Sequence, residues 1–198
     1  MTRNHSPLPS SHLEAGASFH TPSQTLPQRV TLESPAVDVM TDLARIVPET
    51  IGPNATLDAA NQAMIRRGVR LLLVINDSQT ILGLITATDT LGEKPLQFIQ
   101  ARGGTRGEIL VRDIMTPQER LEAIAFEDVL GGTVGRVVAT LKQSGRQHAL
   151  VVDHSRESDK HMVRGIFSLS QIARQLGVPI HTTEIAQTFA EIEALLRH

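Results

Sequence analysis

Hydrophobic positions in the first half of the chain predict one amphipathic helix over residues 56–67. Apolar residues recur there every three or four positions, which is the period of a helix with one buried face. Thr56 is a suitable N-cap because its hydroxyl can accept a backbone hydrogen bond, and Gly68 is a suitable stop. The residues expected on the buried face are Leu57, Ala60, Met64 and Ile65.

A hairpin of two strands is predicted after this helix. Residues 71–75 are a continuous apolar run between turn residues, which is typical of a buried strand. Residues 81–86 form a second apolar run after a short polar turn, so the two runs predict an antiparallel hairpin. Thr88 or Asp89 can then cap a further helix.

The same order of elements recurs in the second half of the chain. Residues 133–144 predict a helix, and its apolar face consists of Val134, Val137, Val138 and Leu141. Residues 149–152 and 162–167 predict two strands. The signals for a closing helix are Ser168 or Ser170 at its start, Leu176 in its last turn and Gly177 as its C-cap.

An internal repeat accounts for this similarity. Three segments recur in the same order at offsets of 75, 77 and 82 residues: Asp38–Thr41 as Asp113–Thr116, Gly68–Asn76 as Gly145–Asp153, and Gly83–Asp89 as Gly165–Gln171. They indicate duplication of a strand–helix–strand–strand–helix unit. One unit of about 60 residues buries too little surface to be stable alone. We therefore expect an α/β fold of the α+β type, in which two units related by a pseudo-two-fold axis pack their sheets together.

The pattern divides the chain into five segments. These are a tail over 1–35, a first unit over 36–91, a linker over 92–110, a second unit over 111–177 and a C-terminal helix over 178–198. The tail holds five of the ten prolines and few apolar residues, so we expect it to be disordered or loosely ordered. Binding of a partner or a metal by the tail is the alternative interpretation.

The two segments outside the units each predict a helix. The linker helix begins near Pro95, because proline is favoured in the first turn, and it ends at the Gly103–Gly104 pair. The C-terminal helix begins near Thr182 or Thr183 and has an apolar stripe that should pack on the core or on a second subunit. The residues of that stripe are Ile185, Phe189, Ile192 and Leu196.

Composition excludes several classes of function. There is no cysteine, so disulfides, thiol nucleophiles and cysteine-ligated metal sites are absent. The net charge of −2 and the lack of Trp and Tyr argue against nucleic-acid binding. No apolar run approaches the length of a membrane span, and the first residues lack the apolar core of a secretory signal. We therefore expect a cytoplasmic protein.

Each unit runs from a hydrophobic-Met-Thr start to a Gly-hydrophobic-hydrophobic-Thr/Ser-x-x-Asp end. A tandem pair of such units resembles the CBS domain family, named after cystathionine β-synthase, whose tandem pair is called a Bateman module. The resemblance covers residues 36–176, and Thr50–Ala60 also looks like the family's approach to its first helix. It implies regulatory binding of AMP, ADP, ATP, S-adenosylmethionine or a related adenosyl compound in clefts between the two repeats.

The resemblance transfers a ligand site onto the Gly83–Asp89 segment. Asp89 would hold the ribose, because a carboxylate can accept hydrogen bonds from both ribose hydroxyls. Thr86 and Thr88 would donate to phosphate or ribose, and Ile85 would line the pocket for the base. Helix capping alone would also account for Thr86, Thr88 and Asp89.

The second repeat departs from the family pattern at Gln171, where an Asp is expected. An amide has one acceptor oxygen and no charge, so it is a weaker ribose ligand than a carboxylate. Ser168 and Ser170 are the candidate ligand residues of this repeat. We expect at most one good nucleotide site per module, the one built on Asp89. The glycine-rich segment 131–135 lacks the Gly-Lys-Ser/Thr of a phosphate-binding loop and is interpreted as a turn.

Two further polar groups allow more than one interpretation. His148 is expected at a strand edge, although it could face the cleft and contact the ligand. The loop 153–161 carries Asp and His residues that could bind a divalent metal, but a solvated loop is the simpler interpretation and we expect no metal site. The basic group Arg66, Arg67 and Arg70 is either a solvated helix end or a site for phosphate or a partner.

These observations favour a non-enzymatic sensor that requires no cofactor. It would bind an adenine nucleotide and signal to a separate effector protein, because the two repeats use nearly the whole ordered chain. One alternative is an adaptor whose CBS pair no longer binds nucleotide. Another is a slow nucleotide hydrolase, for which no convincing general base is present. The resemblance also implies a homodimer formed through helices, with the apolar faces of residues 56–67 and 133–144 available for pairing.

Overall fold

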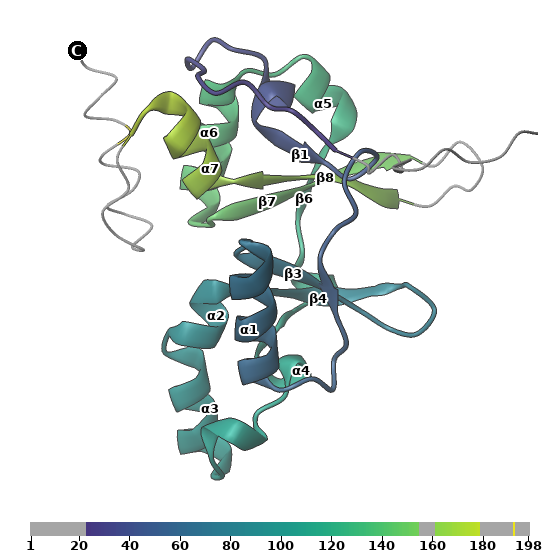
Figure 1. The fold of residues 1–198 in the computed structure, drawn as a ribbon, viewed down its shortest axis with the longest axis vertical. Helices are drawn as coiled ribbons and strands as arrows, with labels where there is room; N and C mark the ends of the chain where they lie inside the picture. The colour runs from purple at the N-terminus through teal and green to yellow at the C-terminus, as the bar shows by residue number, and fades with distance from the viewer. Residues whose placement is uncertain (1–22, 155–160, 179–191, 193–198) are drawn as a thin grey trace, which may run out of the picture.

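The protein has an α+β fold of two stacked units, as the repeat predicts (Figure 1). The structure, a computed structural model, describes residues 23–154, 161–178 and 192. The strands are β1 (Met40–Asp42), β2 (Thr50–Ile51), β3 (Leu71–Ile75), β4 (Ile81–Thr86), β5 (Thr116–Pro117), β6 (Ala123–Ala125), β7 (His148–His154) and β8 (His161–Ser168). The α-helices are α1 (Leu57–Arg67), α2 (Ala87–Leu91), α3 (Lys94–Arg102), α4 (Val111–Ile114), α5 (Phe126–Leu130), α6 (Val134–Ser144) and α7 (Leu169–Leu176). Short 3₁₀ helices cover Ala36–Val39, Arg106–Glu108 and Gln118–Arg120.

Each unit contains one four-stranded sheet, and each sheet includes a strand from the other half of the sequence. The strand orders are β2-β3-β4-β5 and β1-β8-β7-β6. Strand β1 lies at the start of the first repeat (36–91) but pairs with β8 of the second, and β5 lies at the start of the second repeat (111–177) but pairs with β4 of the first. The two units are therefore joined by exchanged edge strands as well as by their packed faces.

The predicted helix ends of α1 and α6 are confirmed. The side chains of Thr56 and Thr133 each accept a backbone hydrogen bond at the start of their helices. Gly68 and Gly145 end the helices with φ values of +65° and +64°. Glycine adopts this left-handed conformation at little cost, so the repeated glycines stop the two helices in the same way.

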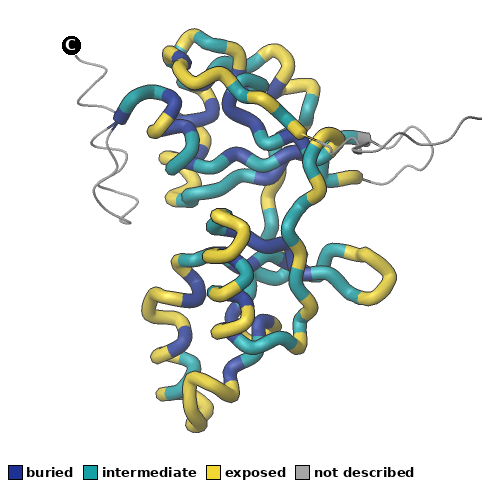
Figure 2. Tube along the Cα trace, viewed as in Figure 1, coloured by how far each residue is buried: buried dark blue, intermediate teal, exposed yellow. Residues whose placement is uncertain are grey.

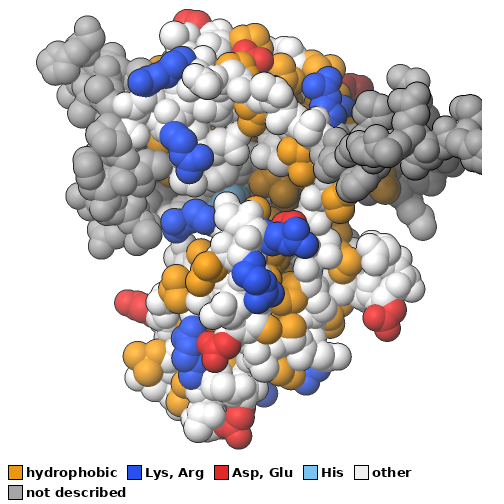
Figure 3. All heavy atoms as spheres, in the orientation of Figure 1, with side chains coloured by type: hydrophobic (Ala, Val, Ile, Leu, Met, Phe, Trp, Pro, Cys, Tyr) orange, Lys and Arg blue, Asp and Glu red, His pale blue; other side chains and the backbone are white. Residues whose placement is uncertain are grey.

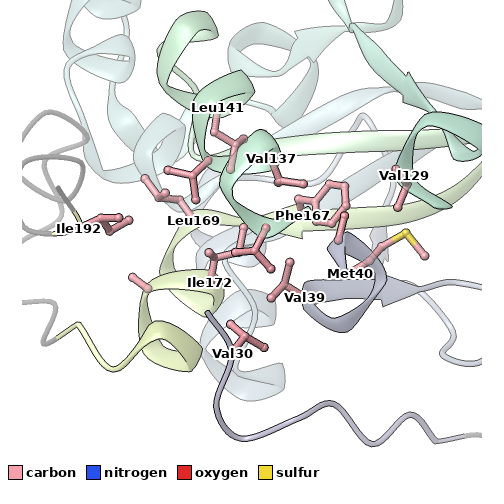
Figure 4. Close-up of a cluster of buried hydrophobic side chains, with 14 of the residues drawn as sticks. Val30, Val39, Met40, Val129, Val137, Leu141, Phe167, Leu169, Ile172 and Ile192 are labelled. Carbon is pink, nitrogen blue, oxygen red and sulfur yellow. The ribbon is translucent and has the colours of Figure 1, made fainter. Parts of the chain in front are cut away.

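Buried apolar side chains form a core within each unit and a third cluster between the sheets (Figure 2). In the first unit, α1 packs against β3 and β4. In the second unit, Phe167 and Ile172 are fully buried among side chains from α6, α7 and the residues before β1 (Figure 4). Between the units, Leu71 and Leu73 of β3 form one buried cluster with Leu150 of β7. The predicted packing of sheet against sheet is therefore confirmed.

Two details of the predicted helix faces are wrong. Ile65 is 65% exposed, because it follows Met64 by one residue and so points about 100° away from the buried stripe. The apolar faces of α1 and α6 are also not available for dimerisation. Both are buried in the cores of their own units, at Leu57, Ala60 and Met64 and at Val134, Val137, Val138 and Leu141.

Residues 23–35, expected to be loosely ordered, are instead packed against the second unit. Val30 belongs to its buried core, and its amide donates to the Gln175 carbonyl at 3.0 Å. The Gln24 side chain donates to the Met40 carbonyl at 2.9 Å and accepts from the Asp42 amide at 2.8 Å. The sequence pattern missed this docking because one buried apolar residue and a few polar contacts create no periodicity. Residues 1–22 lie outside the described part of the chain.

The predicted C-terminal helix falls almost wholly outside the described residues. Of its stripe, only Ile192 is described, and this side chain is fully buried in the core of the second unit (Figure 4). Ile192 therefore packs on the core of its own chain, which is one of the two positions expected for the stripe.

Candidate ligand-binding clefts

Two cavities lie between the two units. The first cleft has a volume of about 300 Å³ and is lined by the β4–α2 turn of the first unit and by the start of β7 in the second. The second cleft has a volume of about 340 Å³ and is lined by the β8–α7 turn of the second unit and by the end of α1 in the first. Both volumes are within the usual range of small-molecule sites. The repeat therefore produces two related clefts, each built from both units.

The β4–α2 turn brings three of the predicted site residues to the first cleft: Thr86, Thr88 and Asp89. The structure corrects the predicted cap of α2, which is Thr86 rather than Thr88 or Asp89. Asp89 Oδ2 accepts from the Thr86 amide at 2.8 Å and from its hydroxyl at 2.7 Å, and Thr86 Oγ1 accepts from the Asp89 amide at 3.3 Å. This reciprocal capping box fixes the carboxylate at the edge of the cavity.

A lysine partners the other carboxylate oxygen of Asp89. Lys94 Nζ lies 2.5 Å from Asp89 Oδ1, and about half of the lysine side chain is exposed. A carboxylate offers about four lone-pair directions, so the three donors present leave room for one more. If Lys94 swings away on its flexible stem, Oδ1 becomes free for ligand hydroxyls while Oδ2 keeps the cap. Helix capping and ligand binding are therefore compatible at Asp89.

The opposite wall of the first cleft comes from the second unit. Arg146 pairs there with Glu122 at 3.1 Å, and Gln147 Oε1 accepts from the Thr88 hydroxyl at 3.3 Å. Three leucines, Leu84, Leu121 and Leu150, supply its apolar surface. The cavity thus offers a polar rim with a fixed carboxylate and an apolar wall against which a flat ring could pack.

Ile85 does not belong to this cleft. Its side chain is fully buried in the core of the first unit, packed with α1 and the other residues of that cluster. Successive side chains of a strand point to opposite faces, so Leu84 and Thr86 face the cavity while Ile85 faces the helices. The expected position of Ile85 on the wall of the cleft is therefore wrong, and Leu84 is the neighbouring strand residue that lines it.

The predicted residues of the second repeat line the second cleft, so they are separated from Asp89, which lines the first. The hydroxyl oxygens of Ser168 and Ser170 lie 3.0 Å apart. Gln171 also lines this cavity, and its amide nitrogen donates to Gln175 Oε1 at 3.4 Å. The candidate residues therefore divide into two sets, one in each cleft.

His148 lies on the wall of both cavities, so it faces the clefts as well as beginning β7. The pKa of its imidazole is lowered from 6.5 to about 4, mainly by burial and in addition by the Arg70 charge, while the Asp89 charge partly opposes the shift. At neutral pH the ring is consequently uncharged. Of the two interpretations that the sequence leaves open, the structure supports a position facing the cleft.

Protonation of His148 should make stability depend on pH. An unfolded chain takes up a proton at this ring near pH 6.5, whereas the folded chain does so only near pH 4, so stability is lost as pH falls through that interval. Between about pH 7 and about pH 5 the loss should be about 2 kcal/mol. Urea unfolding of the wild type and of His148→Gln at both pH values measures it. The variant should lack that part of the pH dependence, and equal dependence in the two proteins would refute the assignment.

Several residues of the clefts had no signal in the sequence analysis. Lys94 lies outside the repeated segments and reaches the first cleft through tertiary packing. Arg146 lies in the repeated segment Gly145–Asp153, but its counterpart in the first copy is Val69, so the repeat does not mark it as polar. Thr116 lines the first cleft and Thr41 the second. These two threonines end the repeated hydrophobic-Met-Thr motif, so this pair could have been found from the repeat.

The described part of the chain contains neither a metal-binding cluster nor a helix that could span a membrane. No group of three or more His, Cys, Asp or Glu side chains there could hold a metal ion. Among the same residues, no helix has both the length and the apolar character needed to cross a membrane. The acidic and histidine-rich loop considered above lies partly outside the described residues.

Comparison with known proteins finds one family match, which covers the first unit. Residues 36–94 match the family model of the CBS domain. No curated protein matches the sequence. The matched segment includes α1, the β3–β4 hairpin and the turn that carries Asp89.

Solved structures show the same fold over most of the chain. A conserved protein from Pyrococcus horikoshii, described as uncharacterized, is similar with a TM-score of 0.52 and 22% identity, over 78% of this chain and 100% of that chain. The CBS domain pair of protein MJ0100, in complex with 5′-methylthioadenosine and S-adenosyl-L-methionine, has a TM-score of 0.50 and 18% identity, over 73% and 96% of the two chains. The CBS-domain protein ATU1752 from Agrobacterium tumefaciens has a TM-score of 0.50 and 16% identity, over 73% and 94%. The described chain thus has the fold of a CBS domain pair.

Proposed function

We propose that the protein is a non-enzymatic regulatory module that binds an adenosine-containing ligand in the first cleft. The observation that carries the proposal is the fixed carboxylate of Asp89, held by Thr86 at the rim of a cavity with an apolar leucine wall. The CBS domain pair of MJ0100, which has this fold, was solved with two adenosyl compounds. AMP, ADP, ATP and S-adenosylmethionine are the candidates for this chain.

The contacts of the first cleft suggest how such a ligand would bind. The ribose hydroxyls would donate to Asp89 Oδ1 and displace Lys94, which then becomes free to pair with a phosphate or carboxylate of the ligand. The Thr88 hydroxyl, now bonded to Gln147, lies on the same rim. The adenine would pack against Leu84 and Leu150 on the apolar wall. Every group of the ligand would thus meet a residue suited to it.

Regulation follows from the position of the cleft between the two units. A ligand that contacts Asp89 on one side and Gln147 or His148 on the other favours one arrangement of the units. An effector protein that prefers the same arrangement would bind more tightly with the ligand present, and the reverse holds by linkage. We further propose that the module works in the cytoplasm as a homodimer. Its pairing surface would be the outer side of α1 and α2, where Ile65 and Leu91 are 65% and 66% exposed.

Thermal unfolding with different nucleotides tests the proposed function. We expect one of AMP, ADP, ATP or S-adenosylmethionine to raise the melting temperature, whereas guanosine nucleotides should not. A ligand at about 100 times its dissociation constant adds about 2.7 kcal/mol of stability, which for this size of chain is a shift of roughly 5–10 °C. No shift with any of the four compounds would favour the adaptor function instead. Release of hydrolysis products with magnesium present would favour the hydrolase.

A further inference from the structure

The two clefts differ in their charge balance. In the first cleft both cations are neutralised, since Lys94 pairs with Asp89 and Arg146 pairs with Glu122. The second cleft is lined by three arginines and one carboxylate: Arg67, Arg70, Arg174 and Glu49. Among the described lining residues, the second cleft therefore has a surplus of two positive charges, whereas the first has none.

Two of the arginines in the second cleft have no acidic partner among the residues that the structure describes. Glu49 lies 3.4 Å from Arg67, which leaves Arg70 and Arg174. Neither of these two forms an ion pair with a carboxylate of the residues that the structure describes. Figure 3 shows Lys and Arg side chains bordering the hollow at the waist between the units. Unpaired guanidinium groups on a cavity wall favour an anionic occupant.

The β8–α7 turn of the second cleft also lacks the carboxylate that the β4–α2 turn of the first cleft carries. Gln171 occupies the place of Asp89, and its amide nitrogen is turned toward Gln175. Gln175 is itself buried and donates to the carbonyls of Pro27 and Asp38, which holds it in place. No carboxylate stands at the β8–α7 turn to accept from two sugar hydroxyls. The hydroxyls of Ser168 and Ser170, by contrast, are donors suited to phosphate oxygens.

The fold places the three arginines of the basic group, Arg66, Arg67 and Arg70, in two different surroundings. Arg67 and Arg70 line the second cleft, whereas Arg66 is exposed and does not. A solvated helix end would account for Arg66 alone. Arg70 is half-buried beyond the end of α1, and its charge acts on His148 at the inner wall of the cavity. Arg70 therefore points to a ligand inside the cleft.

We propose that the second cleft binds a polyphosphate group and recognises it by charge rather than by an attached sugar. Arg70 and Arg174 would pair with the phosphate oxygens, because the guanidinium fork can donate two hydrogen bonds to a phosphate. Ser168 and Ser170 would complete the contacts, and Arg67 would stay with Glu49. The ligand can be inorganic polyphosphate or the phosphate chain of a nucleotide. This site is separate from the adenosine site of the first cleft.

Calorimetric titration with inorganic tripolyphosphate tests this proposal on the full-length protein. We expect binding to the wild type, with affinity about tenfold weaker in Arg70→Gln and in Arg174→Gln, since each loses a charge-assisted contact. Arg66→Gln is the matched control because it removes the same charge from the same region outside the cavity, and its affinity should stay within about twofold. Adenosine, which has no phosphate, should not compete.

Three results would overturn the proposal. The first is no binding of tripolyphosphate to the wild type. The second is an equal loss in Arg66→Gln and Arg70→Gln, which would mean diffuse attraction to the surface. The third is loss in Lys94→Gln with the arginine variants unaffected, which would place the anion in the first cleft, where Lys94 is a cation that could hold it. Failure of the adenosine site would leave the tripolyphosphate result unchanged, so the two proposals fail independently. Two arginine variants keep the test usable if one of them does not fold.

Discussion

Replacing Gly83 with alanine should destabilise the protein by about 3 kcal/mol, because the added methyl group has no space in the fold. A Cβ atom at Gly83 would lie 2.4 Å from the Thr116 carbonyl oxygen, and Met115 and Pro117 are also close. The clash is with backbone, so no side-chain rotation relieves it. Gly83 faces Pro117 in the pairing of β4 with the exchanged strand β5. The methyl group would therefore separate the two strands.

Thermal unfolding measures this effect, with a fall in melting temperature of roughly 10 °C for Gly83→Ala. Gly52→Ala is the matched control, because no atom lies within 4 Å of its added Cβ and its φ is not positive. The control should change stability by less than about 0.5 kcal/mol. If the two variants are equally stable, the close contact between β4 and β5 does not exist in solution.

Asp89→Asn should weaken binding of the adenosine ligand about 50-fold, if the proposed function is right. The substitution keeps the size of the side chain and one acceptor oxygen for the cap, but it removes the charge and the second acceptor. Hydrogen bonds to charged groups contribute more than neutral ones, and the loss of two of them gives an effect of this order. Calorimetric titration of both proteins with the compound that most raises the melting temperature measures it.

Asp113→Asn is the matched control for the loss of a helix cap. Asp113 Oδ2 accepts from the Leu110 amide at 2.9 Å at the start of α4, as Asp89 accepts from Thr86 at the start of α2. Asp113 lines neither cleft. Asp113→Asn should therefore leave the affinity for the adenosine ligand unchanged. Equal affinities of Asp89→Asn and the wild type would reduce Asp89 to a capping residue.

Local patterns predicted the elements well because each has its own signal in a few adjacent residues. The α1 and α6 helices begin at Thr56 and Thr133 and end at Gly68 and Gly145, as their caps indicate. The error at Ile65 shows the limit of spacing, since two adjacent apolar residues cannot both point to the centre of a narrow core.

The exchange of strands could not be predicted from such patterns. Strand β1 has three residues and β5 has two, so neither carries a periodicity of its own. The partner of β1 also lies far away in the sequence, since Met40 pairs with Phe167. Pairing of this kind depends on how the two units pack, and the repeat predicts that packing only in outline.

The candidate site was predicted in its motif but not in its surroundings. Thr86 and Asp89 could be found because they follow a strand in a recognisable turn. The ion pair of Asp89 with Lys94 is a tertiary contact without a motif, and it bears directly on how a ligand would bind. The family motif alone does not predict the burial of Ile85. The alternation of side chains along β4 does predict it, because Ile85 points to the face opposite Leu84 and Thr86.

The measurement that tests the central claim most directly compares each adenosine compound with its 2′,3′-dideoxy counterpart, in the wild type and in Asp89→Asn. AMP, ADP, ATP and S-adenosylmethionine are each titrated by calorimetry. At least one should bind the wild type and lose about 50-fold in affinity without its ribose hydroxyls, while in Asp89→Asn the two forms should bind almost equally. Binding of none of the four compounds, or the same loss in both proteins, would contradict an adenosine site built on Asp89.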